Sequence, residues 1–122
     1  MNWKLWFDEE TKLVRVKVLR TLTRDEAEQM MSDIENIIMK KSIRCGIMDL
    51  SESEAITNLS EKVRDVYKKH ARTLPLDKAA IIVTSPTIRM IAKVVLSAPG
   101  KSTSARVFGT EKDARAWLKE EK

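Results

Sequence analysis

The feature that most constrains the fold is the alternation of short apolar runs with helical patterns after residue 42. The apolar runs are too short for helices and have the length of buried strands. Between them, apolar residues recur three and four positions apart, which is typical of helices packed on one face. Strands that alternate with helices predict parallel strands joined by right-handed crossovers. The predicted strands are 43–50, 78–84 and 105–108, and the predicted helices are 58–72, 86–97 and 110–118.

The first forty residues add a hairpin and a helix. Trp3, Leu5 and Phe7 alternate with other residues, and a second period-two run at 14–19 follows a polar turn. Two such runs predict a β-hairpin. Thr23 and Glu26 have the spacing of a capping box, so a helix is expected over 24–40. The predicted fold is α/β, a mixed five-stranded sheet with an opening hairpin in the order ββαβαβαβα, forming one domain over 1–122.

Composition narrows the class of protein. The chain has 122 residues, 34% of them charged, which suits one globular domain. The apolar run 79–83 is too short to cross a membrane, and the N-terminal residues lack the order of a signal peptide. Cys45 is the only cysteine and is expected to be a reduced, buried thiol. We therefore expect a cytoplasmic protein with no transmembrane segment.

Charge is unevenly distributed along the chain. Residues 1–60 carry nine Lys/Arg and eleven Asp/Glu, whereas residues 61–122 carry fourteen and seven. A basic half can indicate an anionic partner, but lysines and arginines are also favourable at helix ends. The few Tyr and Phe residues are not interleaved with the basic ones as in a base-stacking surface. We therefore expect no nucleic-acid partner.

Polar side chains follow the predicted strands where each one ends. Because parallel strands end at one edge of a sheet, these residues should gather there, at the edge where open α/β sheets bind ligands. The same residue types are also preferred as helix N-caps, so a binding loop and a row of caps both remain open. The candidate ligand or partner loop comprises Asp49, Ser51, Ser53, Thr57, Asn58, Ser60 and Ser85.

No catalytic motif was identified. Gly100 to Thr103 resembles the end of a phosphate-binding loop, but the preceding glycine and the strand–helix context are missing. His70, the only histidine, lies on the apolar stripe of a predicted helix and is expected to be a packed structural residue. No cluster of His and Cys offers a metal site. We predict no catalytic residues, no metal and no cofactor.

The predicted helix 86–97 is apolar around most of its circumference. Arg89 and Lys93, four residues apart, are its only charges. A helix packed on one face normally has a wider polar side. Either the helix is wedged between the sheet and its neighbours, or it presents a surface to a protein partner, a lipid-like ligand or a second copy of the chain. In the second case the candidate interface helix comprises Arg89, Met90, Lys93 and Val94.

The order of these elements, with Gly46 to Leu50 as the central strand and the Arg106–Phe108 strand before Ala114 to Leu118, resembles STAS-type domains. These domains form the fold of bacterial anti-sigma factor antagonists, which is grouped with CRAL-TRIO lipid-binding folds. The resemblance implies a regulatory serine, preceded by an aspartate, at the start of the helix after the central strand. This sequence departs from that pattern, because the Asp-Ser-Ser-Gly sequence is absent. Thr57 stands where the family has the aspartate, and Asn58 stands where it has the phosphorylated serine.

Three functions follow from these observations. The first is a non-enzymatic, STAS-like regulatory module that binds a protein partner or a small, lipid-like ligand. The second is a phospho-regulated anti-sigma factor antagonist with a non-standard acceptor among Ser51, Ser53, Thr57 and Ser60. The third is a small enzyme, which requires a pocket where Asp49 or Glu52 has a strongly raised pKa.

Overall fold

The structure is a computed structural model that describes residues 2–52, 61–71, 73–96 and 104–119. These residues form five strands and four helices in the predicted order. The strands are β1 (Trp3–Asp8), β2 (Leu13–Val18), β3 (Cys45–Asp49), β4 (Lys78–Ile82) and β5 (Ser104–Phe108). The helices are α1 (Arg24–Lys41), α3 (Glu61–Ala71), α4 (Pro86–Leu96) and α5 (Glu111–Lys119).

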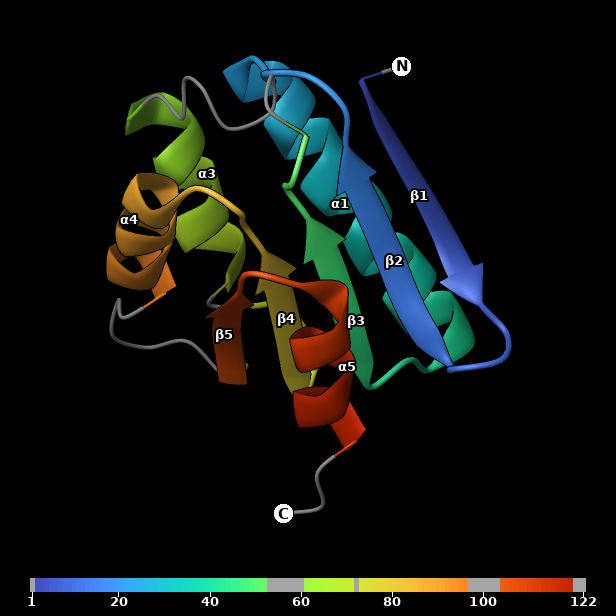
Figure 1. The fold of residues 1–122 in the computed structure, drawn as a ribbon. Helices are drawn as coiled ribbons and strands as arrows, with labels where there is room; N and C mark the ends of the chain where they lie inside the picture. The colour runs from blue at the N-terminus through green and yellow to red at the C-terminus, as the bar shows by residue number, and fades with distance from the viewer. Residues whose placement is uncertain (1, 53–60, 72, 97–103, 120–122) are drawn as a thin grey trace.

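The strands lie in the sheet in the same order as in the sequence, with β3 in the centre. β1 pairs antiparallel with β2, and every later pair is parallel. The predicted α/β class and mixed five-stranded sheet are therefore confirmed. As Figure 1 shows, α1, α3 and α4 lie on one face of the sheet and α5 lies on the other.

Both ends of α1 are capped by hydrogen bonds from residues beside the helix. The Thr23 hydroxyl accepts a hydrogen bond from the Glu26 amide at 3.2 Å, and the Glu26 carboxylate accepts one from the Thr23 amide at 3.0 Å. This reciprocal pair is the predicted capping box. At the other end Ser42 adopts a left-handed conformation with φ 55°. Its amide donates to the Ile38 carbonyl, so the helix ends one residue later than predicted.

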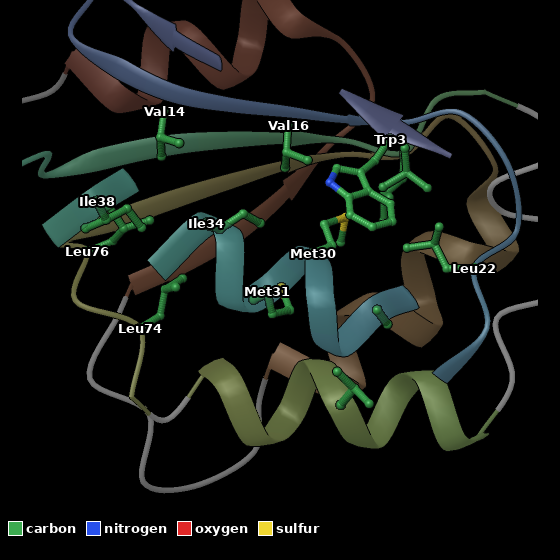
Figure 2. Packing of buried hydrophobic residues seen from close by; sticks show 14 of the residues in the cluster. Trp3, Val14, Val16, Leu22, Met30, Met31, Ile34, Ile38, Leu74 and Leu76 are labelled. Carbon is green, nitrogen blue, oxygen red and sulfur yellow. The ribbon is translucent and has the colours of Figure 1, made fainter. Parts of the chain in front are cut away.

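The main core lies between the sheet and the helices of its first face. Figure 2 shows Val14 and Val16 of β2 pointing towards α1, with Ile38 and Ile34 of that helix facing them. Trp3 of β1 closes this layer beside Met30. α3 adds Val63 and Val66 to the same cluster. The alternating residues of the hairpin thus bury one side of each strand, as their period of two predicts.

A smaller core lies on the face that α5 covers. Its buried members are Leu13, Ile47, Ala80, Ile82, Ala114 and Trp117. Trp117 lies 5.6 Å from the Phe108 ring, measured between ring centroids. Cys45 is a free thiol that packs against this cluster and is half-buried, so the expectation of a buried thiol is met only in part. The thiol is at the start of β3.

Several element boundaries differ from the predicted ones. β3 begins at Cys45 rather than at 43, because the Ile43 amide donates to the Ile38 carbonyl and so finishes the end of α1. β4 ends at Ile82, two residues earlier than predicted, although the Val83 amide still bonds to the Phe108 carbonyl. The predicted start of the helix after β3, at 58–60, lies outside the described residues.

Candidate functional site

The carboxyl edge of the sheet begins with a tight turn after β3. The Asp49 carboxylate accepts a hydrogen bond from the Ser51 amide at 2.8 Å. An Asp side chain that bonds to the backbone two residues later fixes the direction of the chain. The Leu50 amide also donates to the Ile82 carbonyl at 2.8 Å, which extends the pairing of β3 and β4 beyond the strand. Asp49 and Ser51 are therefore held rigidly at the edge, both half-buried.

A lysine from β2 balances the charge of this turn. Lys17 lies beside Asp49 in the parallel register, and its ammonium is 3.2 Å from the Glu52 carboxylate. Both side chains are about half exposed or less, so the pair is partly screened by solvent. The acidic residues after β3 thus have a basic neighbour from a different strand. This pairing was not predicted from the sequence.

Arg15 connects β2 to the start of α5. Its guanidinium pairs with the Glu111 carboxylate and lies 3.7 Å from the Asp8 carboxylate. It also lies over the Trp6 ring, 5.6 Å from the ring centroid. Only 15% of the Arg15 side chain is exposed. Although Arg15 alternates with the buried valines of β2, its side chain is largely covered rather than solvated.

Two hydroxyl groups at the same edge serve as helix caps. The Ser85 hydroxyl accepts from the Ile88 amide at 3.4 Å, and the Thr110 hydroxyl accepts from the Asp113 amide at 3.2 Å. Each bond gives a partner to a backbone N–H group in the first turn of α4 or α5. Part of the hydroxyl-rich edge is therefore structural. The remaining candidates, Ser53, Thr57, Asn58 and Ser60, lie outside the described residues.

The candidate interface helix presents a mixed surface on α4. Met90 is 70% exposed, and Lys93 is also exposed. Arg89 instead is half-buried, with its guanidinium close to Gly109. A Cβ atom at Gly109 would lie 3.3 Å from one Arg89 nitrogen. The two charges of the helix thus separate, with Arg89 turned towards the end of β5 and Lys93 towards solvent. The side chain of Val94 lies outside the described residues.

His70 connects α3 to α1 through two carboxylates. Its Nε2 atom is 2.8 Å from the Glu28 carboxylate, and its Nδ1 atom is 3.4 Å from the Glu35 carboxylate. The hydrogen bond from His70 is the main reason that the pKa of the Glu28 carboxyl lies below its ordinary value. His70 is buried, as expected for a structural residue. Its two acidic partners are a surprise, because nothing in the local sequence indicates them.

Lys78 is a buried cation beneath α5. Its ammonium donates to the Trp117 carbonyl at 3.1 Å and lies 5.0 Å from the centroid of the indole ring. It therefore binds the last turn of α5, where backbone carbonyls lack helical partners. Its burial shows that it is a core residue and not part of a solvated surface.

The titrating groups of the described residues give little indication of catalysis. Burial raises the pKa of the Cys45 thiol, which disfavours the reactive thiolate. Burial also raises the pKa of Tyr67 to about 12, so its hydroxyl stays protonated. Within the described ranges, no group of three or more His, Cys, Asp or Glu residues could hold a metal ion. What the carboxyl edge offers is a rigid turn, paired charges and an exposed helix surface, which suit binding.

A family model called Domain of unknown function (DUF7793) matches residues 5–122. The chain belongs to this family. A search of curated proteins found no match. Along the described helices, no segment combines the length and apolar character needed to cross a membrane.

One solved structure is similar over almost the whole chain. It is an uncharacterized protein from the DUF3478 family, with a SpoIIAA-like fold, from Shewanella loihica PV-4. The TM-score is 0.65 and the identity 18%, covering 96% of this chain and 93% of the other. This similarity confirms the STAS-like fold predicted from the sequence. At this identity it concerns the fold alone.

Proposed function

We propose that this protein is a non-enzymatic regulatory module of the cytosol that binds a protein partner or a small, lipid-like ligand. The binding surface comprises the turn after β3 and the exposed side of α4. The observation that carries the proposal is the exposure of Met90 on a helix whose neighbouring Arg89 is turned inwards. The STAS-like fold is compatible with this role and does not itself specify it.

The chemistry of α4 supports contact with an apolar group. Methionine is flexible and polarizable, and it adapts to partners of different shape. Lys93, one turn away from Arg89 on the same helix, adds a positive charge beside this apolar contact. An acidic protein surface or an amphipathic carboxylate fits both features. Asp49 and Ser51, held in their turn, add polar groups at the same edge of the sheet.

A pair of exposed methionines provides a matched test. Met90 on α4 and Met39 on α1 are both strongly exposed, but they lie on different helices. A photo-crosslinking amino acid at position 90 should capture a partner in cells, whereas the same group at position 39 should not. With the captured partner purified, Met90→Asp should weaken binding at least about tenfold and Met39→Asp should leave it unchanged.

The ligand alternative uses oleate as the probe. Binding to α4 should shift the NMR signals of the amides of residues 86–96 in the full chain, and Met90→Asp should abolish these shifts. The proposal would be contradicted by two results together. The crosslinker at position 39 would capture a protein partner as efficiently as the one at position 90, and oleate would cause no shifts of the NMR signals.

A further inference from the structure

Among the residues that the structure describes, no strand pairs with the outer edge of β1. β1 is the first strand of the sheet, and no described element lies beyond it in Figure 1. The Leu19 amide donates to the Asn2 carbonyl at 2.9 Å, so Asn2 and each second residue after it turn their backbone groups to β2. In an antiparallel ladder the backbone N–H and C=O groups of the residues in between point away from the partner strand. The N–H and C=O groups of Trp3, Leu5 and Phe7 therefore point out of the sheet.

The side chains of β1 suit pairing with an antiparallel copy of the same strand. If Leu5 lies opposite Leu5 of a second copy, then Lys4 lies opposite Trp6 and Trp3 lies opposite Phe7. Lys4 and Trp6 share the sheet face that α5 partly covers, and Trp6 is 40% exposed. An ammonium group beside an indole ring is a favourable pair. Asp8 of the second copy lies diagonally across from Lys4, within reach of a long side chain.

Lys4 has an unfavourable neighbour within its own chain. It lies directly opposite Lys17 of β2, and like charges in that position are destabilising. Lys17 already pairs with Glu52. An edge lysine also opposes pairing with most other strands, because its charge must be accommodated. A second copy of β1 places the Trp6 ring directly opposite Lys4 and the Asp8 carboxylate at one diagonal, while Lys4 of the second copy lies at the other diagonal. The two Lys4–Trp6 and two Lys4–Asp8 contacts of the two-fold pair outnumber this single like-charge contact.

We propose that two copies of this chain pair through β1, antiparallel about Leu5, to form one continuous sheet. The axis of the pair is two-fold, so each contact occurs twice. β1 and β5 are opposite edges of the sheet, and α4 packs against β5. The proposed dimer therefore leaves the α4 surface accessible on both copies. This inference does not depend on the function proposed for that surface.

Sedimentation of the full chain across a concentration series tests the proposal. A strand-edge interface is small, so a weak dimer is expected. Lys4→Glu places a carboxylate near Asp8 and Trp6 of the other copy and should raise the dissociation constant at least about tenfold. The same substitution faces Lys17 within the chain, so the stability of the monomer should not fall. Lys62→Glu, an equal charge change at an exposed site on α3, should leave dimerisation unchanged.

A cross-link tests the register. Residues directly opposite in a hydrogen-bonded antiparallel pair have Cα atoms about 5.5 Å apart, which a disulfide can span. With Cys45→Ser as background, Leu5→Cys should give a disulfide-linked dimer on mild oxidation, whereas Lys62→Cys should not. A wild-type chain that is monomeric at about 1 mM would overturn the proposal. A dimer that neither Lys4→Glu weakens nor Leu5→Cys traps would also overturn it.

Discussion

Gly46 occupies a crowded backbone position in the sheet. It lies on β3, directly opposite Val14 of β2, beneath the main core. A Cβ atom at this position would lie 2.6 Å from Val14 Cγ1, 3.1 Å from the Val14 carbonyl oxygen and 3.4 Å from Leu76 Cδ1. The first of these distances is far below van der Waals contact. Gly46→Ala therefore requires movement of Val14, which is itself packed in the core.

The expected cost can be estimated from two opposing effects. Inserting a methyl group into a packed core typically costs about 1–3 kcal/mol. Replacing glycine by alanine lowers the entropy of the unfolded chain and returns about 0.4–1 kcal/mol. The free energy of unfolding of Gly46→Ala should thus fall by about 1–2 kcal/mol. Gly109→Ala is the matched control, because its methyl group would meet only the flexible end of Arg89, and it should change stability by less than about 0.5 kcal/mol.

A double-mutant cycle identifies the contact responsible. Val14→Ala removes Cγ1 and alone should cost about 2 kcal/mol through the cavity that it leaves. In the double variant, the methyl group at position 46 occupies part of that cavity, so the combined loss should be smaller than the sum by about 1 kcal/mol. Urea unfolding followed by tryptophan fluorescence measures each value. Additivity within about 0.3 kcal/mol, or a stabilising Gly46→Ala, would refute the reasoning.

Three further predictions concern buried or paired ionisable groups. Because the pKa of Glu28 is lowered from 4.5 by the His70 hydrogen bond, its stabilisation is present above that value and is lost as pH falls through the folded-state pKa. Melting temperature should therefore fall less between about pH 6 and about pH 3 in Glu28→Gln than in wild type; equal slopes would contradict this. Because burial raises its pKa, Cys45 should alkylate more slowly in the folded chain than in urea at constant pH. Lys78→Met removes the bond to the Trp117 carbonyl and should accelerate hydrogen exchange in α5; unchanged exchange would exclude that role.

The fold could be predicted from the sequence because its signals are local. The alternation around Val14 and Val16 gives the buried face of β2, and the capping box at Thr23 gives the start of α1. Gly46 and its apolar neighbours predicted a central strand, which β3 is. Each of these patterns depends on residues within one element. Element order and parallel pairing then follow from general rules of chain connection.

The site could be predicted only in part, because its contacts join distant residues. Ser85 was correctly placed at the carboxyl edge, and its capping role follows from the adjacent Pro86. The pairing of Arg15 with Glu111 joins residues 96 positions apart, and no local pattern indicates it. His70 likewise meets Glu28 across two helices. A lone charged residue in an amphipathic pattern looks solvated until the element that covers it is known.

The order of the strands in the sheet has a consequence for how the chain folds during synthesis. Each strand pairs with the one made immediately before it, so the sheet can extend one strand at a time as the ribosome releases the chain, without waiting for a distant partner. The apolar face formed by Leu13, Ile47 and Ala80 is the exception, because α5 is the last described element to be made. Until α5 emerges, no described helix covers this apolar face.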